Sequence, residues 1–259
     1  MINKSKNMDY KKLVETAALA GKIMMESNAE SYRVEDTMLR ILKVSGLETT
    51  EAFAIATALV ITLDDPSIDA ITVVRRVTIR NTNLNNISQV NTICRNFTES
   101  KYNLNQAYSA LKEIQDERYK PFTRGLGIIL FTSFFALLLG GNINEIVVAG
   151  MNGLILIFVN KIDKRISMDG FIKNALSSAF IAIITVLLKN YVFKNINIDV
   201  VTASSIMPLL PGAAITNAFR DLLHGDYMSF GAKALEAVVV ALSIALGVAI
   251  GLLLTGGAL

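Results

Sequence analysis

The residues best placed to do chemistry surround the stretch Pro208-Leu209-Leu210-Pro211-Gly212, inside an uncharged run over residues 200–219. A proline in a helix interior removes a backbone hydrogen bond and clashes with the preceding turn, so this stretch predicts a broken helix. A run of that length can cross a bilayer, where lipid cannot satisfy the backbone groups that a break exposes. Secondary transporters hold their substrates at breaks of this kind. The stretch therefore predicts a binding site for a small solute.

A helix that restarts near Gly212 would direct its N–H groups and the positive end of its dipole at the break, where a carboxylate is favoured. Thr216 and Asn217 follow about one turn later and can hydrogen-bond a polar substrate. The predicted substrate-binding residues are Pro208, Pro211, Gly212, Thr216 and Asn217. The alternative is a proline kink that only shapes helix packing.

Charged residues follow the break at the point where the chain should leave the membrane. Arg220, Asp221 and Asp226 are candidates for a gate or an ion pair, or else for interfacial charge that obeys the positive-inside rule. His224, the one histidine, can titrate near neutral pH or be an incidental loop residue. Two further acids at the ends of apolar runs would carry protons only if they face the interior of a helix bundle: Glu145 and Glu236.

Other chemistries find little support. The single cysteine, Cys94, falls on an apolar helix face, which favours a buried structural thiol. Asp64-Asp65 precedes Pro66 and indicates a solvated turn, and no glycine-rich phosphate loop is present. A net charge of +3 argues against nucleic-acid binding. We therefore expect neither an enzyme nor a metal or other cofactor.

Composition separates two halves. The chain has 259 residues, 52% of them hydrophobic, and a mean hydropathy of +0.46. Residues 1–124 hold 17 of the 25 Lys and Arg residues and 15 of the 22 Asp and Glu residues. This predicts a soluble domain over 1–120 and a membrane domain over 121–259. The chain starts with charged residues, so no cleavable signal peptide is expected and the soluble domain should stay in the cytoplasm.

Five apolar segments are long enough to consider as membrane spans: 122–141, 145–160, 171–188, the broken segment 200–219, and 235–254. Basic residues are more numerous in the loops after the second and fourth segments than in those after the first and third. The positive-inside rule then places the N-terminal domain in the cytoplasm and the C-terminus outside, as expected for a multi-pass protein of the cell (inner) membrane. Gly247 and Gly251 form a small-residue pair that suits close helix packing.

An odd number of spans has a consequence for assembly. Many transporters consist of two inverted halves, and a second copy of this unit would be inverted in the membrane. We therefore expect a partner that supplies the other half.

The soluble half predicts a small α+β domain with the order helix, helix, strand, strand, helix, helix. Apolar residues recur at helical spacing over 13–24 and 34–42, and again over 87–97 and 104–114. One strand is expected over 51–63 and another over 71–80, separated by the turn at Pro66. The predicted fold class is thus a five-span all-α membrane domain with one broken helix, preceded by this α+β domain.

The same residues carry a family likeness. The C-terminal half resembles the signature of the threonine/serine exporter family, larger-subunit type, at Leu210-Pro211-Gly212, Thr216-Asn217-Ala218, Arg220-Asp221, Gly225-Asp226-Tyr227 and Glu236-Ala237. The N-terminal half resembles its cytoplasmic domain at Gly21, Val34-Glu35, Gly46, Arg76-Val77 and Leu84. The chain departs from the pattern at Asn83, where an aspartate is expected, and at Phe230-Gly231-Ala232-Lys233.

This resemblance implies a subunit of an exporter of threonine and serine, or of small dicarboxylates such as succinate, driven by the proton motive force. It also implies a small membrane subunit as partner, a higher oligomer, and roles for Glu35 and Arg76 in the cytoplasmic domain. The alternative from another class is a membrane-anchored regulatory or scaffolding protein. Anchoring needs only one span and no broken helix, so the transporter is favoured.

Overall fold

The computed structural model describes residues 8–78, 80–114 and 119–256. The chain forms two compact units. The N-terminal unit contains the residues up to Glu117 together with Ala213–Ala234, and the membrane unit contains Arg118–Gly212 and the residues from Leu235 onward. The boundary at residue 120 stays a prediction. The segment that groups with the N-terminal residues, Ala213–Ala234, includes the last part of the fourth predicted span and the connection to the fifth.

Two helices form the centre of the N-terminal unit. Helix α1 (Tyr10–Glu26) begins at Asp9, whose side chain accepts a hydrogen bond from the backbone of Lys12. Helix α2 (Ser31–Leu42) follows after a four-residue connection and continues into a short 3₁₀ turn, η2 (Lys43–Ser45). Gly46, at φ 69°, ends that turn in the left-handed conformation that glycine adopts without strain. The apolar residues at helical spacing are buried, as predicted, among them Leu13, Ala17, Met24, Val34 and Met38.

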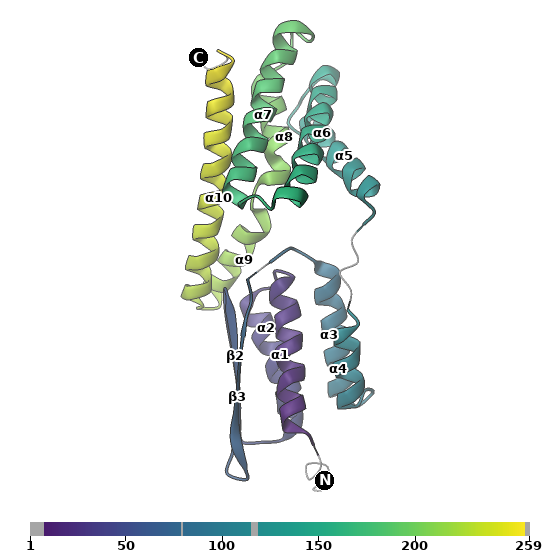
Figure 1. The fold of residues 1–259 in the computed structure, drawn as a ribbon, viewed down its shortest axis with the longest axis vertical. Coiled ribbons are helices and arrows are strands. Elements are labelled where there is room, and N and C mark those ends of the chain that lie inside the picture. Colours follow the sequence, from purple (N-terminus) through teal and green to yellow (C-terminus); the bar gives the residue numbers. More distant parts are fainter. Residues whose placement is uncertain (1–7, 79, 115–118, 257–259) are drawn as a thin grey trace. The chain divides into compact units, whose positions relative to one another are not determined.

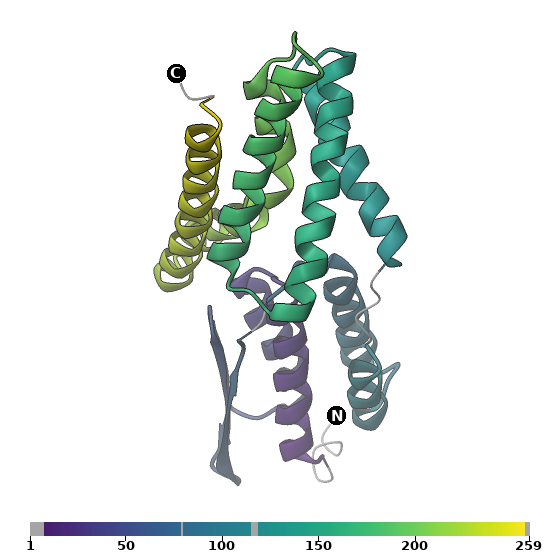
Figure 2. The same cartoon turned by 45° about the horizontal axis from the view of Figure 1, so that its top comes forward.

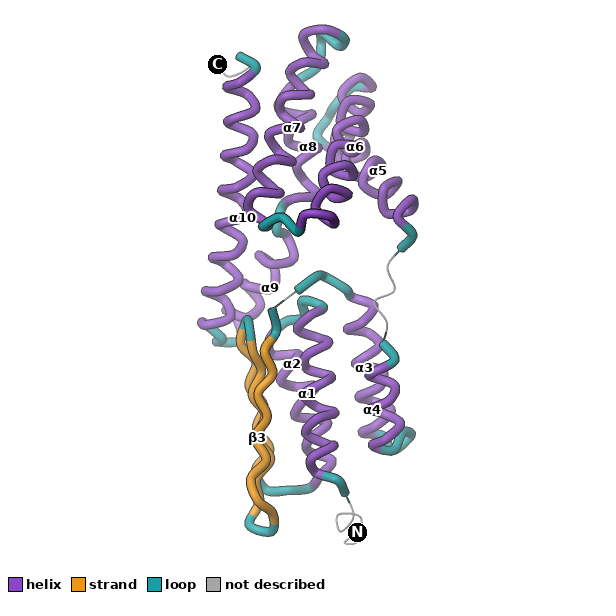
Figure 3. Tube along the Cα trace, in the orientation of Figure 1, coloured by secondary structure: helices purple, strands orange, loops and turns teal. Residues whose placement is uncertain are grey.

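The sheet has three antiparallel strands in the order β1 (Thr49–Ile55), β2 (Ala58–Asp65) and β3 (Ile68–Arg76) (Figure 3). The prediction of a single strand over 51–63 was wrong, because this segment is a hairpin in which Ile55 pairs with Ala58. Its two-residue connection, Ala56-Thr57, lacks the glycine or asparagine that marks most tight hairpin turns. The predicted turn at Pro66 is present, where the Asp65 side chain accepts hydrogen bonds from the backbone and hydroxyl of Ser67.

Helices α3 (Leu84–Thr98) and α4 (Leu104–Lys112) complete the layers of this unit. Figure 1 shows the sheet on one side of α1 and α2 and the α3–α4 pair on the other. One continuous core joins these elements, with Leu59, Ile61 and Leu63 from β2 facing the helices. Cys94 is buried in this core, as predicted.

All regular elements in the described residues of the membrane unit are helices (Figure 2). It contains α5 (Pro121–Leu138), α6 (Ile143–Ile166), α7 (Gly170–Tyr191), α8 (Ile198–Ile206), η3 (Met207–Leu209) and most of α10 (Tyr227–Leu254). Within the described residues, four helices pass the length and hydropathy test for a span: α5, α6, α7 and α10. The bent pair of α8 with η3 and α9 (Gly212–Leu223) passes as a fifth. The predicted broken helix is thus present.

Short helix α8 is central to the membrane unit, because it packs against α5, α6 and α7. Helix α10 approaches α7 closely at Gly247 and Gly251, where an added Cβ would lie within 3.0 Å of α7 backbone atoms. The small-residue pair read from the sequence therefore serves helix packing.

Candidate functional site

Asn152 lies in the interior of the membrane unit. One stripe of α6 is buried, from Glu145 through Val148 and Asn152 to Val159, and Asn152 has no exposed surface. Its Nδ2 atom donates to the hydroxyl oxygens of Thr185 in α7, at 2.9 Å, and Ser205 in α8, at 3.0 Å. A single carboxamide therefore links α6 to α7 and α8, through partners that lie 33 and 53 residues further along the sequence.

The inner face of α8 is unusually polar for a membrane helix. Thr202, Ser204 and Ser205 are all buried. The hydroxyls of Ser204 and Ser205 donate to the carbonyl of Val201, at 2.9 and 2.6 Å, whereas the Thr202 hydroxyl is buried without a partner among the described residues. We call Asn152, Thr185, Thr202 and Ser205 the membrane polar cluster.

Two glycines on either side of Asn152 bring α5 close to α6. A Cβ added to Gly150 would lie 2.6 Å from Ser133 Oγ, and one added to Gly153 would lie 3.0 Å from Ile129 Cα. Both contacts are closer than ordinary van der Waals packing, so only glycine lets the two helices meet at this level. Polar residues buried in a membrane helix are costly and mark sites of function or of helix association.

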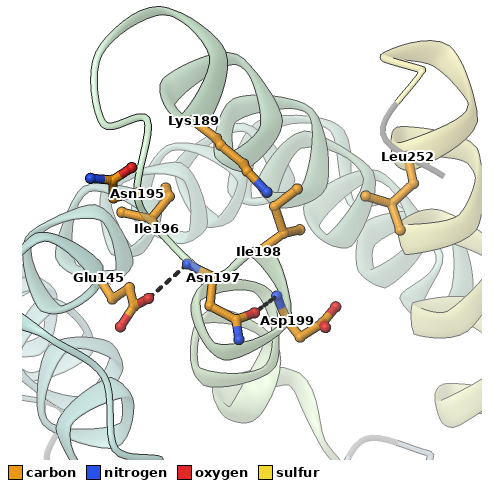
Figure 4. Close-up of a pocket in the computed structure, with 8 residues that line it drawn as sticks. All are labelled: Glu145, Lys189, Asn195, Ile196, Asn197, Ile198, Asp199 and Leu252. Carbon is orange, nitrogen blue, oxygen red and sulfur yellow. Dashed lines mark hydrogen bonds between the residues drawn. The ribbon is translucent and has the colours of Figure 1, made fainter. Parts of the chain in front are cut away.

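A pocket of about 450 Å³ opens beside the N-terminus of α8. Its lining includes Glu145, Lys189, Asn197 and Asp199 (Figure 4). Glu145 is 5% exposed, and its two oxygens accept the backbone N–H groups of Asn142, at 2.6 Å, and Asn197, at 2.7 Å. The carboxylate thus caps α6 and fixes the start of α8, which accounts for its burial. A proton-carrying role for Glu145 stays a prediction.

The helix break lies where the sequence predicts it. Helix α8 ends at Ile206, the residues Met207–Leu209 form η3 with Pro208 in its first turn, and Leu210 is extended. Pro211 precedes Gly212, at which α9 begins. The first turn of α9 holds no acidic residue, so its positive dipole end is not neutralised by its own sequence.

The remaining residues of α9 meet the start of α2 in the N-terminal unit. Asn217 is buried, and its Nδ2 atom donates to the carbonyl of Asn28 at 2.8 Å. Arg220 pairs with Glu30. Asp221 is fully buried and accepts hydrogen bonds from Ser31, through the backbone N–H at 3.2 Å and the hydroxyl at 3.4 Å. It also pairs with Lys233 of α10 at 2.5 Å. We call Glu30, Ser31, Arg220, Asp221 and Lys233 the docking cluster.

The docking cluster supplies a helix cap from a distant part of the chain. The side chain of Glu30, the residue before α2, makes no capping hydrogen bond and turns to Arg220. The first N–H groups of a helix need an acceptor, and a carboxylate there also gains from the helix dipole. Asp221 provides this acceptor across 190 residues of sequence. Arg220 and Asp221, predicted as an ion pair or a gate, thus form two separate ion pairs.

Two acids at the start of α2 have opposite pKa shifts. Burial alone would raise the pKa of Glu30, but its backbone hydrogen bond and the Arg220 and Arg33 guanidinium groups bring it below 4.5. Burial and the nearby carboxylates of Asp226 and Asp221 raise the pKa of Glu35 above 4.5, although the Ala54 N–H opposes this shift. Glu35 accepts that N–H at 2.9 Å and so links α2 to β1.

The remaining residues predicted from the sequence lie at the start of α10, on α9 and in the N-terminal unit. Asp226 accepts the backbone N–H of Ser229 at 3.0 Å at the start of α10. His224 stacks on Tyr32 with ring centroids 3.9 Å apart. Thr216 is exposed on α9, and Arg76 is exposed at the end of β3. Within the described part of the chain, no three His, Cys, Asp or Glu side chains gather as metal ligands.

Sequence reasoning missed most of the buried polar contacts. Thr185 and Lys233 look unremarkable in the sequence, and Glu30 lies far from Arg220 along the chain. The available signal was Gly150-Met151-Asn152-Gly153, in which a carboxamide sits between glycines in an apolar run. A polar residue at such a position has to find partners on neighbouring helices.

Comparison with known proteins assigns the family. The family described as "Putative threonine/serine exporter" matches residues 15–255, which is nearly the whole chain and includes both units. The chain belongs to this threonine/serine exporter family. As a member, it is a multi-pass membrane protein of a transporter family.

A curated relative agrees with this assignment. The chain is 21% identical over 250 residues to a protein of Mycobacterium tuberculosis (strain ATCC 25618 / H37Rv) named "Probable threonine/serine exporter". The match includes 95% of this chain and 47% of the relative, so the chain spans about half the length of the protein it matches. No solved structure matches the chain.

Proposed function

We propose that this chain is the larger part of a two-part secondary transporter that exports small carboxylate-bearing metabolites. The candidates are threonine and serine, or dicarboxylates such as succinate, with the proton motive force as the energy source. Family membership supports export of threonine and serine. The observation that carries the transporter over a mere anchor is the break between α8 and α9, because an anchor has no need of a broken membrane segment.

The residues of the break are proposed to bind the substrate. Pro208 and Pro211 hold the chain out of helix geometry, and the first turn of α9 at Gly212 offers the positive dipole end to a carboxylate. Thr216 and Asn217 follow on the same helix. In the structure the Asn217 carboxamide donates to Asn28, so this role requires that the hydrogen bond open during the transport cycle.

The gate is proposed at Arg220, Asp221 and Asp226. Arg220 holds α9 to the start of α2 through its ion pair with Glu30, and Asp221 does so through the hydrogen bonds it accepts from Ser31. Asp221 also pairs with Lys233 of α10, and Asp226 lies at the turn into α10. Release of these contacts would free α9.

A second membrane part is proposed to complete the transporter. The described chain offers up to five spans, and its match covers only 47% of its curated relative. A small membrane subunit with the inverted half would supply the missing portion, in a complex that holds several copies of each subunit.

The proposed orientation in the inner membrane has the N-terminal domain in the cytoplasm and the C-terminus outside. Alkaline phosphatase fused after Leu259 should be active, since that enzyme folds only outside the cytoplasm. The same reporter fused after Lys164, in the last turn of α6, should be inactive. The reverse pattern would contradict the proposed orientation.

The transport test measures efflux of labelled threonine, serine and succinate from preloaded cells, with and without the small membrane subunit and with and without a protonophore. Asn217→Ala and Pro211→Ala should abolish efflux while membrane insertion is unchanged. Glu30→Gln is the matched control, since it weakens a docking contact of α9 from the α2 side and leaves the Asn217 and Arg220 side chains in place. If Asn217→Ala and Glu30→Gln reduce efflux equally, Asn217 acts in docking rather than in binding.

The scaffolding alternative makes a different prediction. Under that alternative no tested solute leaves the cell faster than in the empty-vector strain, with any combination of subunits. Such a result, with a stable complex in the membrane, would refute the transporter proposal for these solutes.

A further inference from the structure

The Asn152 carboxamide turns its nitrogen towards two hydroxyl oxygens, those of Ser205 at 3.0 Å and Thr185 at 2.9 Å. The Ser205 hydroxyl donates to the Val201 carbonyl at 2.6 Å, which leaves its oxygen to accept from Asn152. The oxygen consequently points away from both hydroxyls.

That oxygen has no partner in the described structure. Asn152 Oδ1 is buried without a hydrogen bond, and so is Thr202 Oγ1. Thr202 lies one turn before Ser205, which places it on the same side of α8. A buried acceptor without a donor costs free energy, and in a membrane interior no bulk water is present to supply the missing hydrogen bond.

Helices α6 and α8 lie alongside each other over this region. Glu145 at the start of α6 contacts the first residue before α8, Asn197, and seven residues later Asn152 contacts Ser205 at the other end of α8. Val148 packs with Val201 between these two contacts. The unpartnered oxygens therefore lie deep within a packed bundle.

We propose that Asn152 Oδ1 and Thr202 Oγ1 form a recognition site for a hydrogen-bond donor of the transported solute, its ammonium or hydroxyl group. The proposal rests on the transport function proposed above and narrows its substrate class. A small amino acid such as serine or threonine brings both an ammonium and a hydroxyl, which can satisfy these two oxygens. A dicarboxylate dianion brings only acceptors, so it would leave Asn152 Oδ1 unsatisfied and face it with like partial charge. The cluster thus selects amino acids over dicarboxylates.

The test measures equilibrium binding of labelled serine to the full chain in membrane vesicles, with unlabelled threonine and succinate as competitors. We expect competition by threonine and none by succinate. Asn152→Leu removes the acceptor and should weaken serine binding about tenfold, the equivalent of one hydrogen bond. Thr202→Val, which changes only a hydroxyl to a methyl, should weaken it several-fold. Asn152→Asp keeps an acceptor and should retain binding of serine even if Asn152→Leu fails to insert.

Ser204→Ala is the matched control. Ser204 is as deeply buried on the same helix, but its hydroxyl is already satisfied by Val201. Its substitution should leave serine binding unchanged.

Two results would overturn the proposal. The first is serine binding that Thr202→Val and Asn152→Leu leave intact, which would mean that the cluster holds only water or ties helices together. The second is competition by succinate equal to that by threonine.

Measurements of binding and of efflux distinguish the failure of this proposal from the failure of the proposed function. Asn152-dependent binding without efflux would refute the transport function and keep the site, whereas efflux unaffected by Asn152→Leu would refute the site and keep the function.

Discussion

Lys233→Met should release α9 from the start of α2. Lys233 is 4% exposed and Asp221 is fully buried, so the pair is almost completely removed from water. Without the ammonium group, the Asp221 carboxylate would keep, within the described part of the chain, only the two donors of Ser31, at 3.2 and 3.4 Å. A buried carboxylate with so little compensation is strongly destabilising.

The magnitude follows from the burial of the pair. Removal of one partner of a buried ion pair costs about 3–5 kcal/mol, mainly because the other charge remains buried. Replacing both partners with apolar residues of similar size is roughly neutral, since no charge is then left behind. We therefore expect Asp221→Leu combined with Lys233→Met to be much more stable than Lys233→Met alone.

Hydrogen–deuterium exchange of the purified chain measures the local effect. A loss of about 3–5 kcal/mol at about 1.4 kcal/mol per factor of ten raises the opening constant of residues 213–234 by roughly 10²- to 10⁴-fold. Exchange should rise in peptides from α9 and from the first turn of α2, and return towards the wild-type rate in the double variant. Lys101→Met, which removes an exposed partner of Glu99, is the control and should change little.

Two outcomes would refute this reasoning. Unchanged exchange over 213–234 in Lys233→Met would mean that the pair does not hold α9. A double variant as labile as the single one would mean that lost packing, rather than an unpaired buried charge, causes the effect.

Three further predictions concern pH and packing. Because the pKa of Glu30 is lowered in the folded chain, its contribution to stability is present above pH 4.5 and is lost as pH falls through the folded pKa. The opening constant of residues 213–234, obtained by dividing the exchange rate by the intrinsic chemical rate at each pH, should therefore rise on acidification, and Glu30→Gln should flatten this rise. The pKa of Glu35 is shifted in the opposite direction, since it is raised in the folded chain. The contribution of Glu35 to stability is therefore greatest below pH 4.5 and is lost as pH rises through the folded pKa. Glu35→Gln keeps an acceptor for Ala54 and should raise the melting temperature at pH 7 but not at pH 4, and an equal effect at both values would contradict the assignment. Gly251→Ala should destabilise the chain by about 1–3 kcal/mol, because its Cβ would lie 2.6 Å from the Ala179 carbonyl oxygen. The control is Gly231→Ala on the same helix, whose Cβ would meet nothing within 4 Å and which should be neutral or slightly stabilising. Thermal unfolding in detergent measures both effects.

Several elements were predictable because their signals are local. The membrane helices follow from long apolar runs, and the break follows from two prolines whose effect on a helix needs no distant partner. The hairpin of β1 and β2 was not predicted, since its turn at Ala56-Thr57 has ordinary residues and its strands form one continuous apolar run. Hairpin register depends on pairing across strands, which such a run does not specify.

The amino-acid sequence by itself determined the class of this protein, a multi-span membrane chain with one broken helix and a separate charged half, because hydropathy and proline act within a few residues. Only the tertiary structure decided which polar groups meet. Asn152 finds Ser205 across 53 residues, and Asp221 caps α2 across 190. A buried polar group must be satisfied, but its sequence position does not say by which partner, since that choice is made when distant helices pack.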